Sequence, residues 1–424
     1  MLSSYVDSIF RPGIFKRNFI NNYSKGLSYI PAAAMMMADP LPASKILSIK
    51  HTANLDIMKL RKGMILVSCA GTLGNVRMID DQLDGTIGSQ DIIRVCVQKH
   101  QGFIYALLAS SYTYNYILSK SYGSVVSRLE PSTLENMPIP QINSIIKDKV
   151  DALIQESCAL REEATTDLQK ADDLLKEMTH LRKLNTEDYD YFGQHSATRK
   201  PSCFIRKISE ISSRSINAFN YSERLERLIN LIPAHRPLRD FLLGNTTFST
   251  GSFPRIEVKE GKGVMLINQS DAFDTIIKGK WISTRNVNLN NLVDYGEVII
   301  AGVGTLGENE TFCRALFANE DLKGQLISGE FIRMKTIKDI PSGFLYAWLN
   351  SDYGFRLIRG TQAGTKLCRP IPEAFLDIPV PILSKEDMNE IDRMVREAHT
   401  KRHIANKKEL EAIAMVEAEI EKWN

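Results

Sequence analysis

The feature that most constrains this chain is an internal repeat. The stretch LRKGMILVSCAGTLGN, residues 60–75, matches VDYGEVIIAGVGTLGE, residues 293–308. Further along, GFIYALLASSY (102–112) matches GFLYAWLNSDY (343–353). A chain of 424 residues is too long for one comfortable core, and a repeat of this length is a structural unit used twice. We therefore expect two copies of one globular module.

Each copy ends with a Pro-x-Pro and a long helical pattern. The prolines lie in residues 138–140 (PIP) and 379–381 (PVP). Residues 145–183 and 384–423 then contain no proline or glycine and carry one apolar stripe at helical spacing, and Ser384 is expected to cap the second helix. At about 1.5 Å per residue each helix spans roughly 60 Å. One apolar stripe of that length needs a partner, so we expect the two helices to pack antiparallel as a coiled coil.

The sequence thus predicts an α+β chain in which two mixed modules are joined by two long antiparallel helices. Each module reads as short strands, one helix (Gly102–Leu118 and Gly343–Ile358) and a polar loop (122–132 and 362–373). The predicted limits are 1–140 for the first module, 141–199 for the first helix and its linker, 200–383 for the second module, and 384–424 for the second helix.

A glycine motif in the second copy raises the question of a nucleotide site. Residues 302–307, GVGTLG, spell G-x-G-x-x-G after an apolar run, which is how a dinucleotide-binding turn begins. In the first copy Cys69 replaces the first glycine, and the residues after both turns (75–79 and 311–315) have the pattern of strands. A tight strand–turn–strand with glycines at positive φ is the better interpretation, and an NAD-linked enzyme would rest on this motif alone.

No other pattern indicates catalysis or a bound cofactor. The sequence has no P-loop, no G-x-S-x-G elbow and no nuclease-like carboxylate set. His399 and His403 have a metal-binding spacing, but Lys401 and Arg402 lie between them and no third ligand is evident, so a solvated basic face is predicted. Six scattered cysteines without a C-x-x-C pair suit reduced thiols in a cytoplasm, and no apolar run reaches the length of a membrane span.

Two variable modules, each closed by a Pro-x-Pro and a long helix, resemble the specificity (S) subunit of type I restriction-modification enzymes. The resemblance is carried by the paired Gly-Thr-Leu-Gly turns (71–74 and 304–307), the two Pro-x-Pro segments and the two helices, over nearly the whole chain. It implies two target recognition domains, each reading half of a split DNA site, with no catalytic, cofactor or metal site in this chain. It also implies double-stranded DNA, DNA adenine methyltransferase subunits and restriction/translocase subunits as partners.

The two copies differ at their start. Residues 25–26 align with residues 262–263, so the stretch 202–245 is expected to have no counterpart in the first copy. That stretch contains Arg214 and Tyr221, like the arginine and tyrosine that commonly open such modules. The first recognition domain is therefore expected to be shortened at its N-terminal side.

The polar loops and glycine turns supply groups that can contact phosphates and base edges. The candidate DNA-binding residues are Thr72, Asn75, Arg77, Ser124 and Arg128 in the first module, and Thr305, Thr365, Lys366 and Arg369 in the second. The alternative is that the glycine turns only hold the fold while other loops touch DNA. The net charge of +3 does not decide between DNA and protein partners, so a coiled-coil scaffold whose modules bind proteins remains a competing function.

Overall fold

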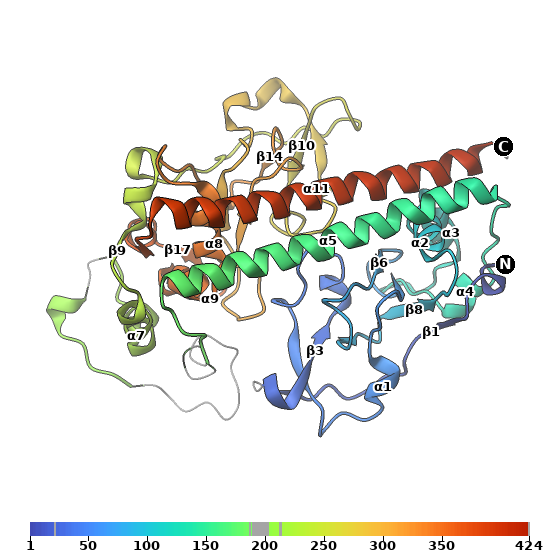
Figure 1. Cartoon of the computed structure of the whole chain (residues 1–424), viewed down its shortest axis with the longest axis horizontal. Coiled ribbons are helices and arrows are strands. Elements are labelled where there is room, and N and C mark those ends of the chain that lie inside the picture. The colour runs from blue at the N-terminus through green and yellow to red at the C-terminus, as the bar shows by residue number, and fades with distance from the viewer. Residues whose placement is uncertain (21–22, 186–187, 189–202, 212–213, 423–424) are drawn as a thin grey trace. The chain divides into compact units, whose positions relative to one another are not determined.

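The computed structural model of the chain contains two compact units (Figure 1). Unit 1 consists of Met1–Ala164 and Lys401–Asn424, and unit 2 of Thr165–Thr400. Both units contain helices and short strands, so the predicted mixture of α and β structure is confirmed. The structure describes residues 1–20, 23–185, 188, 203–211 and 214–422, and most of the predicted linker, 189–199, lies outside them.

Most helices are short, and two are long. The α-helices of the described residues are α1 (Leu55–Met58), α2 (Gln101–Ala109), α3 (Ser111–Lys120), α4 (Pro131–Glu135), α5 (Ser144–Met178), α7 (Glu223–Leu231), α8 (Ser342–Asn350), α9 (Asp352–Gly360), α10 (Pro372–Leu376) and α11 (Lys385–Glu421). The Ser384 hydroxyl accepts a hydrogen bond from the Asp387 amide at 3.0 Å, so the predicted cap of the second long helix is confirmed. The predicted module limits exclude the long helices, whereas each compact unit includes one part of each.

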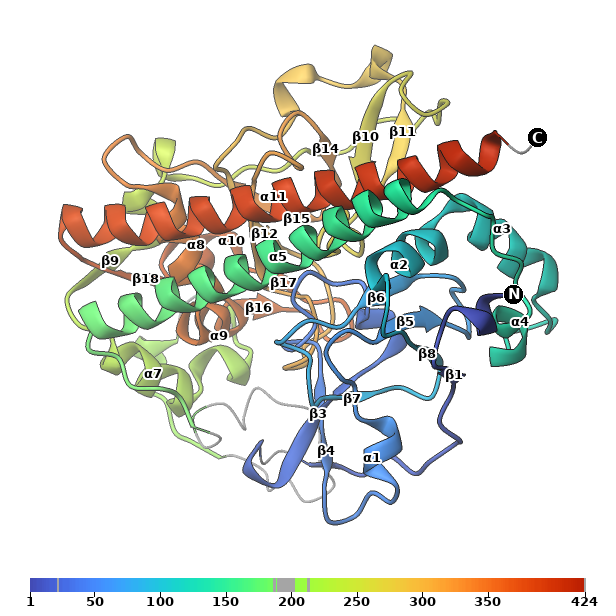
Figure 2. The same cartoon turned by 45° about the vertical axis from the view of Figure 1, so that its right-hand side comes forward.

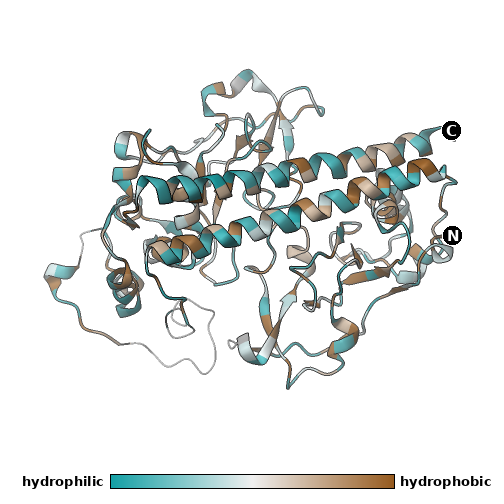
Figure 3. Cartoon of the chain, in the orientation of Figure 1, coloured by the Kyte–Doolittle hydropathy of each residue, from teal (hydrophilic) through white to brown (hydrophobic). Residues whose placement is uncertain are grey.

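Within unit 1, the first part of α5 packs against the last part of α11. Lys149 pairs with Glu411, and Glu163 pairs with Lys401, so residue numbers rise along one helix as they fall along the other. This is the antiparallel direction expected from the sequence. Hydrophobic and hydrophilic residues alternate along both helices (Figure 3). The buried apolar side chains of this part of the pair are Val150, Ile154, Ala164, Ala405, Ala412 and Val416.

A buried polar network fixes the register between α2 and the long helices of unit 1. The Tyr105 hydroxyl donates to a Glu409 carboxylate oxygen at 2.7 Å, and the Arg161 guanidinium binds the other oxygen at 2.5 Å. Arg161 also donates to the amide oxygen of Asn406 at 2.8 Å. Burial beside Glu409 raises the pKa of Tyr105 well above its usual value, so the hydroxyl remains a donor. A shift of one helix along the other would break several of these bonds together.

Unit 1 contains two four-stranded sheets. The first is antiparallel, in the order β1 (Ser8–Phe10), β8 (Ile92–Cys96), β5 (Ile65–Ser68), β6 (Val76–Met78). The second has the order β2 (Phe19–Ile20), β4 (Lys45–Ser48), β3 (Gly26–Ile30), β7 (Ile87–Gly88), and its β3 and β7 are parallel.

Unit 2 contains two three-stranded sheets. Their strand orders match those of β8, β5 and β6 and of β4, β3 and β7 in unit 1. The first contains β13 (Ala315–Phe317), β12 (Val298–Ala301) and β15 (Phe331–Met334). The second contains β11 (Lys280–Ile282), β10 (Val264–Ile267) and β14 (Leu326–Ile327), with β10 and β14 parallel. Two further pairs are β16 (Gln362–Ala363) with β17 (Arg369–Pro370), and β18 (Pro379–Pro381) with β9 (His235–Pro237). The strand predicted within 311–315 begins only at Ala315, because a turn precedes it.

One arginine is buried at the same place in each unit. Arg94 lies opposite Leu66 on β5, and Arg333 lies opposite the matching Ile299 on β12. Both side chains are fully buried. Their neighbours differ, because Met64 occupies in unit 1 the place that Glu297 occupies in unit 2.

The two buried arginines are stabilised in different ways. Arg333 forms two hydrogen bonds with the Glu297 carboxylate, at 2.8 and 2.9 Å. Among the described residues no carboxylate pairs with Arg94, which donates to the carbonyls of Gly88, Ser89 and Ile92 at 2.6–2.9 Å. Burial lowers the pKa of Arg94 to about 10. Unit 1 therefore holds its buried cation with backbone dipoles, and unit 2 holds its cation with an opposite charge.

A glycine brings each module against a long helix. The Gly102 amide donates to Asp151 on α5 at 2.7 Å, and the Gly343 amide donates to Asp392 on α11 at 2.7 Å. A Cβ at Gly102 would lie 2.7 Å from the Asp151 carbonyl oxygen, closer than real side chains come. The absence of a side chain is therefore what allows α2 to approach α5.

We expect Gly102→Ala to destabilise unit 1 by about 1–3 kcal/mol, because the new methyl group forces α2 away from α5. In an ordinary helix the same change would stabilise the protein by about 1 kcal/mol. The sign of the change in the free energy of unfolding therefore tests whether α2 contacts α5 at Gly102. Gly13→Ala, in the same unit with no atom within 4 Å of its Cβ, is the control and should stay within about 0.5 kcal/mol of the parent chain. Denaturant unfolding of the three proteins measures the effect, and a neutral or stabilising Gly102→Ala would contradict it.

The single module helix predicted in each copy is wrong, since each is two helices. The break falls at Ser110 between α2 and α3, and at Ser351 between α8 and α9. Each serine side chain accepts a hydrogen bond from an amide of the next helix, Thr113 or Gly354. A serine cap with extended backbone starts a new helix in a new direction.

The match between the units extends closer to the N-terminus than the sequence comparison indicated. The Leu2 amide donates to the Met137 carbonyl at 2.8 Å, and the Leu238 amide donates to the Ile378 carbonyl at 2.8 Å. Leu2 thus takes the place of Leu238, and residues 238–245 have counterparts in unit 1. The expectation that 202–245 as a whole lacks a counterpart is wrong for its last part.

His399 does not lie on a solvated face, contrary to the prediction. Its ring is buried against those of Phe317 and Tyr346, with centroids 5.1 and 5.3 Å away, because this side of α11 packs on the sheet of unit 2. Among the described residues, no helix is long and apolar enough to cross a membrane.

Candidate nucleic-acid interface

In each unit the glycine turn lies beside the polar loop that precedes the Pro-x-Pro. In unit 1 the Gly71 amide donates to the Ser127 carbonyl at 3.0 Å. In unit 2 Gly304 and Cys368 exchange two backbone hydrogen bonds, of 3.2 and 2.7 Å. Segments that lie far apart in the sequence therefore meet at one place in each unit. These are the segments that supply most of the predicted DNA-binding residues.

The polar loop is a hairpin in both units. Tyr122 and Arg128 exchange backbone hydrogen bonds of 3.1 and 2.7 Å in unit 1. Ala363 and Arg369 form the corresponding antiparallel pair of β16 and β17 in unit 2. Arg128 and Arg369 therefore stand at the same position, at the base of each hairpin.

Glycine permits the tight tip of each hairpin. Gly123 has φ +103° and Gly364 has φ +108°, a region that other residues rarely adopt. A Cβ at Gly123 would lie 2.3 Å from the carbonyl oxygen of Val126. The side chains that follow are exposed, and Val125 is 94% exposed. The exposed tip residues are Ser124, Val125, Val126 and Ser127 in unit 1, and Thr365, Lys366 and Leu367 in unit 2.

Most of the predicted DNA-binding residues reach the surface. The exposed ones are Thr72, Ser124, Arg128, Thr305, Thr365, Lys366 and Arg369. Asn75 is half-buried, and its backbone amide donates to the Ser68 hydroxyl at 2.9 Å.

Arg77 is the exception and belongs to the core of unit 1. Its guanidinium donates to the carbonyls of Met35 and Met37 and lies 3.5 Å from the Asp80 carboxylate. Its side chain is buried because the segment around Met35 covers this side of β6. We therefore exclude Arg77 from the interface.

The hairpins present cations without acidic partners. Within the described ranges, no carboxylate forms an ion pair with Arg128, Lys366 or Arg369. In unit 1 the carboxylate of the nearby Glu130 forms an ion pair with Arg11, at 3.3 Å, and accepts a hydrogen bond from the Tyr122 hydroxyl. Exposed cations of this kind suit an anionic partner such as a phosphate backbone.

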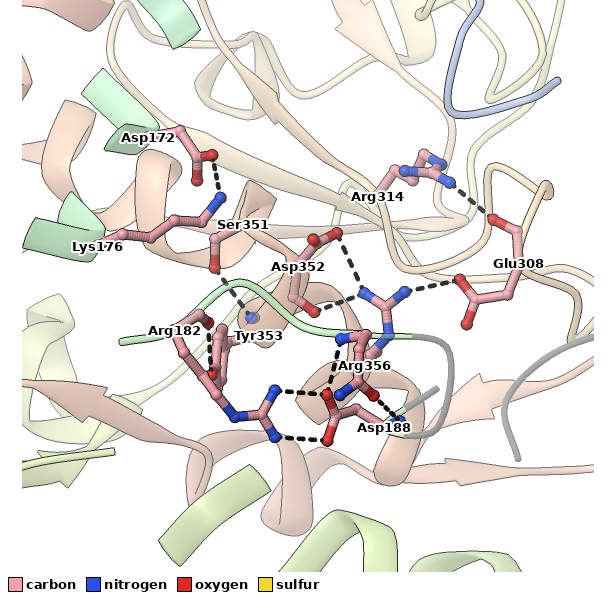
Figure 4. Close-up of polar contacts among 12 residues, drawn as sticks. Asp172, Lys176, Arg182, Asp188, Glu308, Arg314, Ser351, Asp352, Tyr353 and Arg356 are labelled. Carbon is pink, nitrogen blue, oxygen red and sulfur yellow. Dashed lines mark hydrogen bonds and ion pairs between the residues drawn. The ribbon is translucent and has the colours of Figure 1, made fainter. Parts of the chain in front are cut away.

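In unit 2 side chains tie the glycine turn to α9 (Figure 4). The Arg356 guanidinium donates to the Glu308 carboxylate at 3.3 Å and to the Asp352 carboxylate at 3.2 Å. Arg314 donates to the Glu308 carbonyl at 2.8 Å, and its guanidinium stacks over the Phe355 ring at 4.4 Å. These contacts thus hold the segment after the glycine turn against α9.

The same turn does not have the context of a dinucleotide site. It follows β12, and the next regular element after the turn is strand β13. A dinucleotide-binding motif requires a helix whose N-terminus faces the pyrophosphate. The interpretation as a strand–turn–strand is confirmed. The predicted positive φ holds for Gly71 and Gly74 in the first copy but is wrong for Gly302, Gly304 and Gly307 in the second.

Comparison with known proteins gives one kind of match. No protein-family model and no curated protein sequence matches the chain. Among solved structures, the S subunit of a type I restriction-modification system from M. genitalium is 14% identical, with a TM-score of 0.35, over 98% of this chain and 96% of that one. The HsdS subunit from Thermoanaerobacter tengcongensis is 14% identical, with a TM-score of 0.27, over 99% and 94%.

A third similar structure describes complex assembly and conformational transition of the type I R-M system, at 13% identity and a TM-score of 0.26, over 98% and 96%. Two of these three structures are S subunits, and the third is described as a study of the type I R-M system. The predicted resemblance is thereby confirmed. At these TM-scores the likeness carries no argument about function, so the proposal below rests on the residues of the chain itself.

A second group of cations, which the sequence prediction missed, lies around the sheet of unit 1 that contains β3 and β4 (both strands are labelled in Figure 2). The Lys45 ammonium on β4 lies 5.5 Å from the centre of the Phe19 ring on β2, which is 41% exposed. The cations of this region are Lys16, Arg17, Lys25, Lys45 and Lys50. In the described part of the chain none of them forms an ion pair with a carboxylate. The signal was present in the sequence, since Asp39 is the single acidic residue between 14 and 51.

The residues at the hairpins have groups that can bind an anionic partner. The residues gathered at the hairpins are hydroxyls, guanidiniums and an ammonium. No group of three or more His, Cys, Asp or Glu side chains that could hold a metal occurs within the residues that the structure describes.

Proposed function

We propose that the chain is the DNA sequence-specificity subunit of a type I restriction-modification complex. It reads a bipartite, asymmetric site and positions methyltransferase and restriction subunits. The observation that carries the proposal is the pair of exposed hairpins, one in each unit, each with an exposed arginine at the same position that forms no ion pair with any carboxylate the structure describes.

The two hairpins support a split site with unlike halves. They have the same backbone construction, so each unit presents an equivalent binding surface. Their tips differ, since Ser-Val-Val-Ser (124–127) in one unit replaces Thr-Lys-Leu-Cys (365–368) in the other. Because base edges are distinguished by side-chain chemistry, different tips read different bases. The site is therefore not palindromic.

The spacing of the two half-sites follows from the geometry of DNA. For both units to reach the major groove on one face of a duplex, the half-site centres lie about one helical turn, ~10 bp, apart. The base pairs between the two halves are not read. The long helices α5 and α11, each of which continues from one unit into the other, set this distance.

Chemistry on the DNA belongs to the partner subunits. An adenine inside a duplex reaches a methyltransferase site only when it is extruded, and that pocket lies in the methyltransferase. The chain itself binds no S-adenosylmethionine and selects where the partner acts.

The test is to replace the hairpin arginines in the complex purified with its methyltransferase partner. We expect Arg128→Ala or Arg369→Ala to weaken DNA binding by about 1–3 kcal/mol if the arginine reads a base. If the arginine contacts a phosphate, the log-salt slope should fall by about 1. Lys99→Ala and Lys338→Ala, which remove exposed lysines elsewhere in the same units, are the matched controls and should bind as the parent does.

Melting temperatures separate this proposal from a purely structural role of the hairpins. Arg128 and Arg369 are exposed, so their replacement should leave both units as stable as before. Unfolding of a unit with no selective loss of DNA binding would mean that the hairpins only hold the fold. Full DNA binding by both variants would show that the hairpin arginines are not part of the DNA interface.

A further inference from the structure

Three cations lie at one end of the unit 1 sheet that contains β3 and β4. The Ile49 amide, just after β4, donates to the Lys25 carbonyl, just before β3, at 3.2 Å. On the other side of β4, the register of β2 brings Arg17 level with Ile49. Lys50 follows Ile49 directly. Residues from three segments of the chain therefore place their charges at the same end of the sheet.

The sheet of unit 2 that contains β10 and β11 repeats this arrangement. The Ser283 amide donates to the Ile256 carbonyl at 2.8 Å, as the Ser48 amide donates to the Asn18 carbonyl at 2.9 Å in unit 1. Strands β10 and β3 also pair with their neighbours in the same registers. The cations that these registers match are Arg17 with Arg255, Lys25 with Lys262, Lys45 with Lys280, and Lys50 with Arg285.

The matched cations at the end of the two sheets are exposed. We call Arg17, Lys25 and Lys50 in unit 1, and Arg255, Lys262 and Arg285 in unit 2, the sheet-end cations. Within the residues that the structure describes, no carboxylate forms an ion pair with any of the six. Exposed like charges that the chain itself does not neutralise favour an anionic partner.

The comparison of the two units indicates which part of DNA these cations fit. The tips of the two hairpins differ in sequence, whereas the sheet-end cations have the same charge at the same positions. In duplex DNA the base edges change with sequence and the phosphate backbone does not. A surface that is the same in both units therefore fits the backbone, while the unlike hairpin tips fit unlike bases.

We propose that the sheet-end cations of each unit form a second DNA-contact surface, which binds the phosphate backbone without reading the sequence. This inference rests on the proposed function and divides it between two surfaces. The hairpins select the site, and the sheet-end cations supply affinity that falls as the salt concentration rises.

The two units differ at the fourth matched position. In unit 1 the Lys45 ammonium lies 5.5 Å from the centre of the Phe19 ring, which leaves its positive charge in place. In unit 2 the matching Lys280 forms an ion pair of 2.5 Å with Glu257, the residue at the place of Phe19. Unit 1 therefore contributes more backbone affinity than unit 2.

The test removes cations from the complex purified with its methyltransferase partner. Lys25→Gln with Lys50→Gln changes unit 1, and Lys262→Gln with Arg285→Gln changes the matching positions of unit 2. We expect each double variant to lower the log-salt slope of DNA binding by about 2, because each phosphate contact contributes about 1. Affinity should fall by the same factor on a duplex with the methylated motif and on a scrambled duplex of equal length. Fluorescence anisotropy of both labelled duplexes over a range of salt concentrations measures these quantities.

Matched controls remove the same charge elsewhere in each unit. Arg61→Gln with Lys99→Gln in unit 1, and Lys323→Gln with Lys338→Gln in unit 2, replace exposed cations and should keep the parent slope. Because all the replaced side chains are exposed, the four double variants should also keep the parent melting temperature.

A gain of binding tests the difference between the units. Glu257→Gln leaves Lys280 without its counter-charge, so unit 2 gains the cation that Lys45 provides in unit 1. We expect the log-salt slope to steepen by about 1 and both duplexes to bind more tightly. Loss of folding cannot produce this result. Asp339→Asn, which removes an exposed carboxylate elsewhere in unit 2, is the control and should bind as the parent does.

Three results would overturn the proposal. The first is a parent slope in both double variants and in Glu257→Gln; if the hairpin-arginine variants still lose binding, the proposed function stands without this second surface. The second is a loss of preference for the motif over the scrambled duplex, which would mean that the sheet-end cations read bases. The third is a loss of the methyltransferase partner on size-exclusion chromatography, which would mean that a protein covers them.

Failure of the proposed function has a different signature. A parent complex that binds both duplexes equally would count against sequence specificity. A lower slope in the double variants would support backbone binding even then.

Discussion

Replacing Glu297 with methionine is expected to destabilise unit 2 by about 3–5 kcal/mol, because it leaves the buried Arg333 without a counter-charge. Both side chains are at most 1% exposed, so water cannot take the place of the carboxylate. Of its hydrogen bonds to described residues, Arg333 would keep those to the carbonyls of Asn291 and Leu292 and to the Thr250 hydroxyl, whereas Arg94 in unit 1 donates to carbonyls of its own strand and turn. The substitution copies Met64 of unit 1 without copying those carbonyls.

The effect is measured by urea unfolding followed by tryptophan fluorescence. Two of the three tryptophans, Trp281 and Trp348, lie in unit 2 and report on it. The double variant Glu297→Met with Arg333→Met is the control, and it should recover most of the loss because no unpaired charge remains. A single variant that loses less than about 1 kcal/mol would show that the carboxylate is not what holds Arg333.

Lengthening both long helices by one turn is expected to change the DNA site that the complex methylates. We would insert four helix-forming residues after Ala164 in α5 and four after Thr400 in α11, at the limits of the two units. Four residues add about 6 Å at 1.5 Å per residue, close to two base pairs of DNA. The unread gap between the half-sites should then grow by one or two base pairs, while both half-site sequences stay the same.

The insertion has a control in unit 1. The same four residues placed after Gly13, whose surroundings are open, should leave the site unchanged. Sequencing of methylated sites from each variant gives the comparison. An unchanged gap in the helix variant would mean that α5 and α11 do not set the spacing.

The long helices were predictable from the sequence except where α5 ends. The absence of proline and glycine extended the prediction to residue 183, whereas α5 ends at Met178. His180 adopts a left-handed conformation, with φ +53°, and the Leu181 amide donates a hydrogen bond to the Lys176 carbonyl at 3.0 Å. Glycine usually takes this position, and a histidine there gives no signal in the sequence. Leu181 then packs in the core of unit 2.

The candidate site was predictable in its segments but not in every residue. The repeat located the two hairpins and their turns, because the same letters recur around both. It could not show that Arg77 is buried, since all of β6 is covered and strand alternation therefore fails there. The sequence also could not show which of the two buried arginines, Arg94 or Arg333, pairs with a carboxylate. That difference depends on Met64 and Glu297, which are far from both arginines in the sequence.

The most direct test of a DNA-specificity role is the methylome of the native host with and without this chain. We expect an adenine-methylated motif made of two different halves separated by unread base pairs. That motif should be present when the chain is present and lost when it is deleted. A methylome that is unchanged by the deletion would contradict a DNA-specificity role for this chain.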